Sequence, residues 1–442
     1  LYFTLALQSA VKKAFLSLPR TDAAGDRELL PSFYLSRCGE ALLGKRPGLQ
    51  ELHRLPGYRR LSAGAVPAAE EAVYEYDYDL ACCRRPDLAS KAGRYLRRLS
   101  PFLERVLDFD ASARTTHFTA YQGIVGAASA GKGSNSPESG LAVTALEEYA
   151  RCPYSYFLKH LLRLQPLEEP EAALGLSPAR RGLLMHRILE LFYRESNSRG
   201  LLPVLRFPGE NEALLEEICR RELAEFARFN PPYFDLLWEL EQLELVAMAQ
   251  ALLAWEIEAG EPFIPEHFEF NFDRVNNGAG FCLELPGGER LFLRGRIDRI
   301  DSDGKRLRVI DYKTGRKRGK NDSFEGGTAL QLPVYLLAAA RLCGTDPAQA
   351  EACAYFLSAG GVERVAFSGQ DWPEKEQALV ETIAVINGGI SDSFFAPFPG
   401  ANGANCRSCP YKAICGPNVE ALFRRKAADP RLADFLKLKE NK

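Results

Sequence analysis

A regular alternation of apolar and polar residues runs through the middle of the chain. Residues 291–297 alternate in this way, which is the two-residue period of a half-buried strand. The tripeptide Ser302-Asp303-Gly304 supplies turn-forming residues, and a second apolar run follows at residues 307–310. The pattern predicts two strands, over residues 291–302 and 307–313, joined by a tight turn.

Similar patterns predict the other elements of the same folded region. Alternation predicts further strands near residues 268–272, 279–285, 352–358 and 362–367. Apolar positions spaced three to four residues apart predict helices near residues 180–193, 328–343 and 373–387. Thr144 and Glu147 form the capping-box pattern of another helix start. Strands interleaved with helices indicate an α/β fold.

Charged residues stand at one end of the two strands that the turn joins. Asp298 lies in the first strand, and Asp311 and Lys313 follow the apolar run of the second. Because side chains two residues apart point to the same face of a strand, Asp311 and Lys313 share a face. Two carboxylates and an ammonium group are costly to gather unless something binds there.

A divalent cation is the ligand that this set of groups favours. Carboxylate oxygens suit Mg²⁺ or Mn²⁺, and such a cation activates water and neutralises charge on a phosphoryl group. The alternative is an ordinary hairpin with surface charges, in which Asp298 pairs with Arg296 or Arg299.

A histidine on a predicted helix adds a third candidate ligand. His186 and Glu190 are four residues apart in the pattern of residues 180–193, so they lie on one face of that helix. Neutral imidazole is a common metal ligand. A histidine in this setting is also compatible with an ordinary surface or core position, and the pattern leaves both interpretations open.

The order of these residues resembles a known family. Asp298, followed by Asp311-x-Lys313 at the end of an apolar strand, resembles the PD-(D/E)XK nuclease superfamily, and the wording GRIDRID…VIDYKTG is similar to its RecB and AddB C-terminal branch. The resemblance implies a restriction-endonuclease-like α/β core, in which helices flank a central mixed sheet. It also implies a metal-dependent deoxyribonuclease, which hydrolyses phosphodiester bonds.

The resemblance assigns the metal ligands and their neighbour. By this assignment, Mg²⁺ is held by His186, Asp298, Asp311 and the carbonyl of Tyr312. Glu190 is expected behind these ligands rather than on the metal.

The resemblance also assigns the residues that handle substrate. Lys313 is expected to position the attacking water. Gln331 and Tyr335, four residues apart on the predicted helix, are expected near the phosphate of the scissile strand. Without the resemblance, these two residues fit a polar helix end equally well.

A short basic segment follows the second strand, at Arg316, Lys317, Arg318 and Lys320. A run of charge is usually just a solvated surface. Directly after a phosphodiester site, however, it is suited to clamp the DNA backbone, whose negative charge dominates binding. It is also the local positive patch that a net charge of −2 does not supply.

Cysteines near the C-terminus form the most specific motif in the chain. Cys406, Cys409 and Cys415 have the spacing C-x₂-C-x₅-C, and a tetrahedral or cuboidal centre needs a fourth ligand. Cys152, followed by Pro153 and aromatic residues, is the candidate, although alone it would be a core cysteine. Four thiolates suit a [4Fe–4S] cluster and Zn²⁺ about equally. The motif resembles the iron–sulfur staple of AddB-type nucleases and of a CRISPR-associated exonuclease family, which implies [4Fe–4S].

Composition sets limits but does not point to a function. The 442 residues suffice for two or three domains, and 46% hydrophobic with 26% charged residues is ordinary for globular proteins. Eleven cysteines are too sparse for a secreted disulfide framework, so we expect a reducing cytoplasm. An apolar run long enough to span a membrane and a signal-peptide pattern are both missing, so no membrane partner is expected.

The N-terminal part of the chain resembles a different protein region. Residues 1–35 resemble, weakly, the end of an AddB-type helicase region, although their stretch ALQSAVKK lacks the arginine used in ATP hydrolysis. We therefore expect a smaller helicase-derived α/β segment over residues 1–125. Residues 126–132 nearly spell a phosphate-binding loop, but Gly133 stands where Ser or Thr is needed. We therefore expect a flexible linker at residues 126–138 and the nuclease domain at residues 139–442.

The function implied is that of an Mg²⁺-dependent exonuclease or endonuclease domain in an AddB-like helicase–nuclease subunit. By resemblance, it acts on double- and single-stranded DNA ends during recombinational repair, together with an AddA-like helicase–nuclease subunit. The chain opens without methionine, and we expect it to be a fragment of a longer polypeptide. Two alternatives are a stand-alone CRISPR-associated-type iron–sulfur exonuclease, which the extra N-terminal residues disfavour, and a non-cleaving scaffold that binds DNA ends, which the intact acidic set disfavours.

Overall fold

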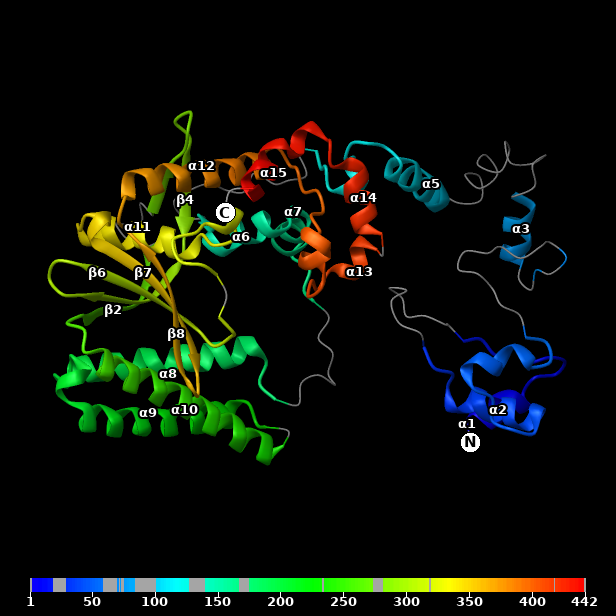
Figure 1. Ribbon diagram of the computed structural model, residues 1–442, viewed down its shortest axis with the longest axis horizontal. Coiled ribbons are helices and arrows are strands. Elements are labelled where there is room, and N and C mark those ends of the chain that lie inside the picture. Colours follow the sequence, from blue (N-terminus) through cyan, green and yellow to red (C-terminus); the bar gives the residue numbers. More distant parts are fainter. Residues whose placement is uncertain are drawn as a thin grey trace. The chain divides into compact units, whose positions relative to one another are not determined.

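Figure 1 shows the computed structural model of the chain. It describes residues 2–18, 29–58, 70, 72, 75–83, 101–126, 140–166, 175–232, 234–272, 281–317, 319–416 and 418–440. The chain divides into two compact units, Leu1–Ala113 and Arg114–Lys442. All of the candidate site residues belong to the second unit.

The described residues of the first unit form helices, and no strand occurs among them. These elements are α1 (Tyr2–Gln8), α2 (Phe33–Leu43), the 3₁₀ helix η1 (Leu49–Arg54), α3 (Glu75–Cys83) and α5 (Pro101–Ala113). Ser32 Oγ accepts a hydrogen bond from the Leu35 amide at the start of α2. The helicase-like origin of this region stays a prediction, and the expected linker, apart from Gly126, lies outside the described residues.

A five-stranded mixed sheet forms the centre of the second unit. Its order is β2 (Ile264–Asn271), β5 (Arg296–Ser302), β6 (Leu307–Lys313), β7 (Ala350–Ser358) and β8 (Gly361–Ser368). β6 and β7 are parallel, while the other neighbouring pairs are antiparallel. Parallel strands need a crossover, and α11 (Gln331–Cys343) lies in it. The predicted α/β fold with a mixed sheet between helices is confirmed.

The pairing between β5 and β6 ends before the charged residues are reached. The last paired residues are Arg299 and Ile310, so residues 311–313 pair only with β7. The Tyr312 amide, released from the ladder with β5, donates instead to Asp298 Oδ2 at 2.7 Å. The two strands therefore separate at the point where Asp298 and Asp311 stand.

The first predicted strand is in fact two strands of different sheets. β4 (Arg290–Arg294) pairs with β1 (Leu141–Ala142) and β3 (Phe281–Glu284), and the chain enters β5 only after Gly295. A Cβ atom on Gly295 would lie 2.6 Å from the Phe272 ring. The prediction of one strand over residues 291–302 was wrong because alternation continues across this bend, which needs a residue without a side chain.

Helices cover both faces of the central sheet (Figure 1). On one face lie α8 (Pro178–Ser198), α9 (Pro208–Phe229) and α10 (Asp235–Ala259), which share a core with Ile310, Tyr312 and Tyr355 of the sheet. On the other lie α11 and α12 (Trp372–Ser391), which share a second core with Ile300, Val309 and Ala352. No described helix is long and apolar enough to cross a membrane.

The remaining elements of this unit are short, and most of them lie in its first and last parts. The helical ones are η3 (Ala120–Gln122), α6 (Val143–Arg151), α7 (Pro153–Tyr156), η4 (Phe157–Leu161), η6 (Val204–Arg206), η8 (Glu325–Gly327), η9 (Pro347–Gln349), η10 (Ala401–Cys406), α13 (Lys412–Cys415), α14 (Val419–Lys426), η11 (Pro430–Leu432) and α15 (Ala433–Glu440). The Phe118 amide donates to the Asp429 carboxylate at 2.7 Å, and the Phe395 amide donates to the Gly123 carbonyl at 2.8 Å. Residues 114–126 therefore pack with the C-terminal part of the chain.

The capping box expected at Thr144 and Glu147 does not form. Ala142 occupies the N-cap of α6 without a side-chain hydrogen bond, and Thr144 is exposed on the helix. Glu147 instead accepts hydrogen bonds from two amides at the start of α11. The sequence pattern was local, whereas the partner of Glu147 lies 184 residues along the chain.

Candidate active site

His186 and Asp298 bracket the backbone of Tyr312. His186 lies in the first half of α8, where buried Met185 and Ile188 direct the helix onto the sheet. Its Nδ1 lies 3.2 Å from Asp298 Oδ1, and its Nε2 lies 3.0 Å from the Tyr312 carbonyl. Asp298 is 8% exposed and uses its other oxygen on the Tyr312 amide. The structure thus brings together three of the four predicted metal ligands.

The contacts of His186 govern its protonation. Burial alone would lower the pKa of His186, but the hydrogen bond and charge of Asp298 outweigh burial and raise this pKa. Without a cation, the imidazole is therefore biased towards its protonated form. A cation at this place would compete with that proton for the ring nitrogen.

Glu269 is a member of the site that the sequence patterns did not reveal. In the register between β2 and β5, Phe268 pairs with Arg299 and Phe270 with Ile297, so Glu269 stands opposite Asp298. Like charges on facing strand positions destabilise a sheet. Burial, and then the charge of Asp298, raise the pKa of Glu269. Its only sequence signal is an acidic residue within the alternating phenylalanines of β2.

The backbone at Glu269 is irregular. Its φ angle is 49°, in the left-handed region that non-glycine residues rarely adopt within a strand. Ligand atoms of His186, Glu269 and Asp298 all lie within 4.8 Å of one another, so that, among the described residues, this group could hold a metal ion. Asp311 is not part of this group of three.

Asp311 begins a chain of polar contacts instead. Lys313 Nζ lies 2.7 Å from Asp311 Oδ2 and donates to Gln331 Oε1 at 3.0 Å. Gln331 Nε2 in turn donates to the Tyr335 hydroxyl at 3.1 Å. The three residues predicted to handle substrate, Lys313, Gln331 and Tyr335, are thus linked to one another and to the predicted metal ligand Asp311.

Burial changes the protonation of this chain as well. Burial raises the pKa of Asp311 to about 6, against the opposing charge of Lys313. Burial alone would lower the pKa of Lys313, but the charge of Asp311 outweighs it and raises this pKa. Lys313 is consequently held as an ammonium group beside a carboxylate, although its side chain is 37% exposed.

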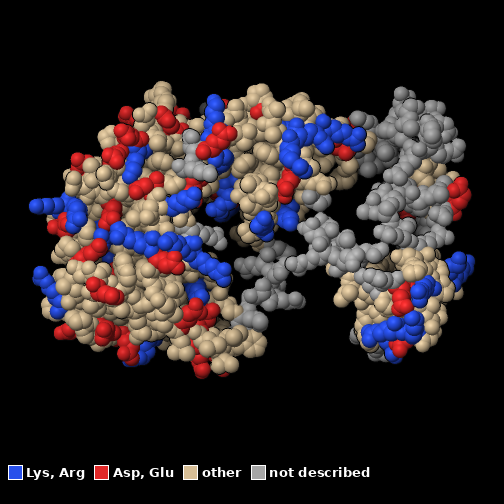
Figure 2. Space-filling model, in the orientation of Figure 1, with Lys and Arg blue, Asp and Glu red and all other residues tan. Residues whose placement is uncertain are grey.

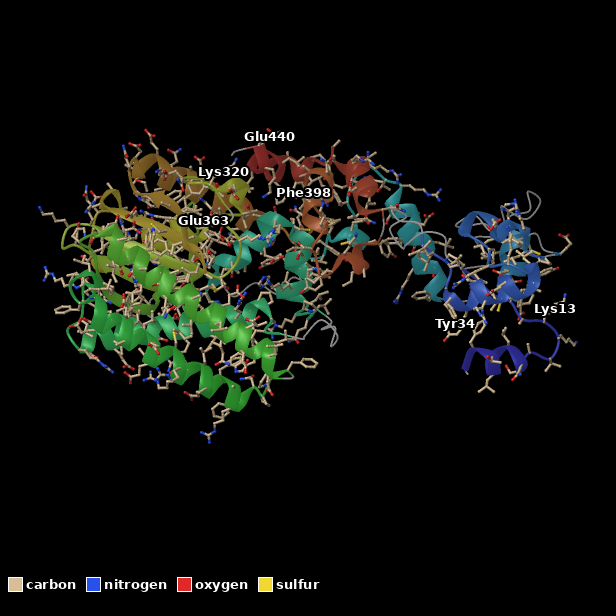
Figure 3. The ribbon with its side chains drawn as sticks, turned by 60° about the horizontal axis from the view of Figure 1, so that its bottom comes forward. Lys13, Tyr34, Lys320, Glu363, Phe398 and Glu440 are labelled. Atoms are coloured by element: carbon tan, nitrogen blue, oxygen red, sulfur yellow. The ribbon has the colours of Figure 1, made fainter. Side chains whose placement is uncertain are left out.

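The basic segment after β6 lies on the surface. Arg316, Lys317 and Lys320 are exposed, whereas Arg318 lies outside the described residues. Lys317 Nζ lies 3.8 Å from a carboxylate oxygen of Glu363. Figure 3 shows the positions of Lys320 and Glu363. Figure 2 shows a row of Lys and Arg atoms across a face where acidic and basic side chains are otherwise mixed. The basic segment is therefore accessible to an anionic partner.

The four predicted cysteine ligands line a single cavity of about 520 Å³. Cys152 lies between α6 and α7, Cys406 ends η10, and Cys415 ends α13. The Phe398 amide donates to Cys152 Sγ at 3.3 Å, and Asn405 Nδ2 donates to the Arg151 carbonyl at 2.8 Å. These contacts bring segments about 250 residues apart in sequence around the same space.

The sulfur chemistry of these cysteines is compatible with two occupants. Four thiolates around one cavity suit Zn²⁺ or a [4Fe–4S] cluster. Burial raises the pKa of the Cys415 thiol to about 12 and raises the pKa of the Cys152 thiol, so both favour the thiol form until a metal displaces the proton.

Comparison with known proteins identifies the family. The model of the PD-(D/E)XK nuclease superfamily matches residues 140–416, which is more than half of the chain. The chain belongs to the PD-(D/E)XK nuclease superfamily.

Relatives of this nuclease carry a more specific name, the B-type subunit of an ATP-dependent helicase/deoxyribonuclease. The protein of this name from Symbiobacterium thermophilum is 33% identical over 207 residues, a region covering 45% of this chain and 17% of that protein. Those from Alkaliphilus metalliredigens and Clostridium botulinum are 30% and 29% identical, over 44% of this chain and 17% of each relative. The match thus spans about a sixth of each relative's length.

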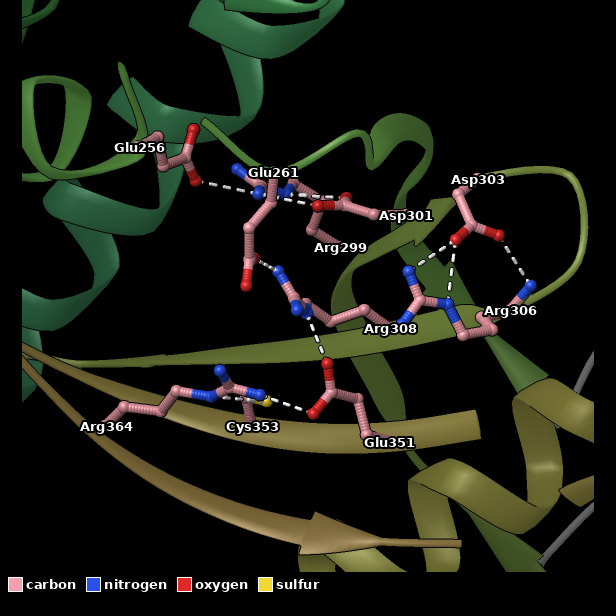
Figure 4. A network of polar contacts seen from close by, with 10 residues as sticks. All are labelled: Glu256, Glu261, Arg299, Asp301, Asp303, Arg306, Arg308, Glu351, Cys353 and Arg364. Carbon is pink, nitrogen blue, oxygen red and sulfur yellow. Dashed lines mark hydrogen bonds and ion pairs between the residues drawn. The ribbon is translucent and has the colours of Figure 1, made fainter. Parts of the chain in front are cut away.

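A buried ionic network lies behind the site of this nuclease (Figure 4). Arg299, which is 4% exposed, makes two hydrogen bonds to Asp301, of 2.8 and 2.7 Å, and one of 2.7 Å to Glu256. It also donates to the Tyr312 hydroxyl at 2.9 Å and lies 4.2 Å from the Tyr193 ring centroid. The network therefore fixes the residue whose backbone contacts both His186 and Asp298.

The same network engages the two arginines that the hairpin alternative places beside Asp298. Arg299 pairs with Asp301 and Glu256, and Arg296 pairs with Glu269. The ion pairs of Asp298 with Arg296 or Arg299 that this alternative names therefore do not form among the described residues. Farther along the sheet, Arg308 continues the network with Glu351 and Glu261.

Proposed function

We propose that this nuclease hydrolyses phosphodiester bonds of DNA with the help of Mg²⁺. The observation that carries the proposal is the convergence of His186, Glu269 and Asp298, within 4.8 Å, close to the ion pair of Asp311 and Lys313. Two facing carboxylates and an imidazole are a donor set for a divalent cation. Charges of one sign at facing strand positions are hard to explain as a device for stability.

The oxygen and nitrogen donors of this group suit a divalent cation. Asp298, Glu269 and His186 would hold it, with Asp311 and the Tyr312 carbonyl as the further ligands that the family resemblance implies. The ion would supply an activated water and neutralise charge on the phosphate. Mn²⁺ has the same preference for these donors.

The chain's own residues supply the remaining functions. Lys313, held between the Asp311 carboxylate and the Gln331 amide oxygen, places a positive charge where the phosphate becomes more negative. Tyr335 and Gln331 support that position from α11. The exposed Arg316, Lys317 and Lys320 bind the DNA backbone by charge.

We further propose that Cys152, Cys406, Cys409 and Cys415 bind a [4Fe–4S] cluster. All four cysteines line one cavity, which supports a shared group, and the resemblance of their motif to the iron–sulfur staple of AddB-type nucleases favours a cluster over Zn²⁺. The cluster would act as a structural tie between the first helices of the domain and its last turns.

The names of the relatives support a role within a larger machine. We propose that the chain is the nuclease part of an AddB-like subunit, which works with an AddA-like subunit on DNA ends in recombinational repair. The support is the matching region shared with proteins named as B-type subunits of an ATP-dependent helicase/deoxyribonuclease.

The decisive experiment compares cleavage with binding. Asp311→Ala should reduce single-turnover cleavage of end-labelled DNA in Mg²⁺ by roughly 10²–10³-fold, because a buried carboxylate beside the reacting group is lost. DNA affinity measured by fluorescence anisotropy should stay within about twofold of wild type. Asp434→Ala, at an exposed position of α15, is the matched control. Undiminished cleavage by Asp311→Ala would refute the assignment, and a wild-type protein that binds but never cleaves would point to the scaffold alternative.

A further inference from the structure

The first turn of α11 is capped by a residue from another helix. The N-cap residue Leu330 provides no side-chain hydrogen bond of its own. Glu147 Oε1, from α6, accepts from the Leu330 amide at 2.7 Å and from the Gln331 amide at 2.9 Å. The amides at the start of a helix have no hydrogen-bond partner within the helix. A carboxylate there also interacts favourably with the positive end of the helix dipole.

The capped turn carries a residue of the hydrolytic site. The same Gln331 whose amide binds Glu147 accepts a hydrogen bond from Lys313 Nζ with its side-chain oxygen, at 3.0 Å. Two hydrogen bonds thus separate Glu147 from the ammonium group of Lys313. The Glu147 carboxylate is also close enough to Lys313 and Asp311 to feel both of their charges.

Glu147 stands on a firmly anchored helix. Leu146, Tyr149 and Ala150 of α6 are at most 1% exposed. The Tyr149 hydroxyl donates to the Phe394 carbonyl at 2.6 Å. A carboxylate on a rigid helix can hold a neighbouring helix in place, whereas a carboxylate on a mobile element would move together with its neighbour.

We propose that Glu147 is a positioning residue of the hydrolytic site, which holds the first turn of α11 so that Gln331 keeps Lys313 in place. This inference rests on the proposed nuclease function, because it concerns the place of Lys313. A cap that served stability alone would lower the resistance to unfolding but leave the turnover of folded protein unchanged. A positioning cap lowers turnover while DNA binding persists.

The test uses two substitutions of Glu147 in the complete chain. Glu147→Ala removes both acceptor contacts, whereas Glu147→Gln keeps an oxygen that accepts from the same amides. We expect Glu147→Ala to lower kcat for Mg²⁺-dependent DNA cleavage by about 10- to 100-fold, since small misplacements have effects of this size, with KM within about twofold. Glu147→Gln should retain at least about a third of the wild-type kcat. Thr144→Ala, on an exposed position of the same helix, is the matched control.

A second measurement does not depend on activity. Hydrogen–deuterium exchange of the amides of residues 330–332, 334 and 335 should become faster in Glu147→Ala and stay near wild type in Glu147→Gln, while exchange in β6 and β7 is unchanged. If exchange is faster in Glu147→Ala but the wild-type protein does not cleave DNA, the nuclease function is refuted and only the capping role of Glu147 is supported. An unchanged kcat in Glu147→Ala, equal losses in both Glu147 variants, or exchange raised throughout the domain would each overturn the positioning role.

Discussion

At the scale of single residues, the side chains of the site make polar contacts with both of their terminal polar atoms. Asp298 contacts His186 with one oxygen and the Tyr312 amide with the other. Gln331 accepts from Lys313 and donates to Tyr335. Contacts at both ends leave each side chain one orientation, so little rearrangement is needed when a cation and a phosphate arrive.

Asp298→Asn tests the residue on which most of these contacts converge. The amide keeps the size of the carboxylate but removes its charge, so we expect Mg²⁺ affinity measured by isothermal titration calorimetry to fall at least about tenfold. Cleavage should fall by roughly 10²-fold or more. Glu374→Gln, which removes a charge from the exposed start of α12, should leave both values unchanged. Equal Mg²⁺ affinity in wild type and Asp298→Asn would remove Asp298 from the ligand set.

The sequence reveals those site residues whose spacing is local. Asp311 and Lys313 share a strand, and Gln331 and Tyr335 share a helix turn, so two periodicities predict their common faces. Glu269 could not be found in this way, because its position opposite Asp298 depends on the register of β2 against β5. The predicted capping-box role of Glu147 was wrong for the same reason. Its carboxylate binds amides at the start of α11 instead of capping its own helix.

At the scale of elements, the separation of β5 from β6 creates the site, and the network around Arg299 supports it. The pairing ends at Arg299 and Ile310, and the freed Tyr312 amide turns to Asp298. Strand positions were largely predictable from alternation, but the bend at Gly295 was not, because β4 and β5 continue one pattern in two sheets. The end of a strand pair depends on packing that no local pattern contains.

Arg299→Met tests the supporting network. Removal of this guanidinium leaves Asp301 and Glu256 buried without their partner, so we expect the free energy of unfolding in urea to fall by about 3–5 kcal/mol. Arg306→Met removes an arginine that is 54% exposed and pairs with Asp303, and should cost less than about 1 kcal/mol. If the two substitutions cost the same, the network around Arg299 does not support the site.

At the scale of the whole second unit, segments distant in sequence meet at the cysteine cavity. Residues 114–126 and α6 pack against the C-terminal elements, and Cys152 faces the same space as Cys406, Cys409 and Cys415. The spacing of the last three cysteines indicates only that a fourth ligand is missing, and the family resemblance proposes Cys152 for it. A metal group that linked these cysteines across so long a loop would restrict the unfolded chain strongly and so stabilise the folded one.

Cys152→Ala tests that link. Anaerobically purified wild type should contain about four iron atoms per chain and absorb visible light, whereas Cys152→Ala should lose most of the iron and unfold at a temperature lower by several degrees. Cys343→Ala, at an exposed cysteine of α11, should keep the iron and the unfolding temperature. Stoichiometric zinc and no iron in the wild type would show that the cavity holds the other metal.

The short helix α6 carries Glu147 near its middle and ends directly at Cys152. A shift of Cys152 would therefore be transmitted along one short helix to the carboxylate that caps α11. Damage at the cysteine cavity would then disturb the arrangement around Lys313 before the central sheet unfolds.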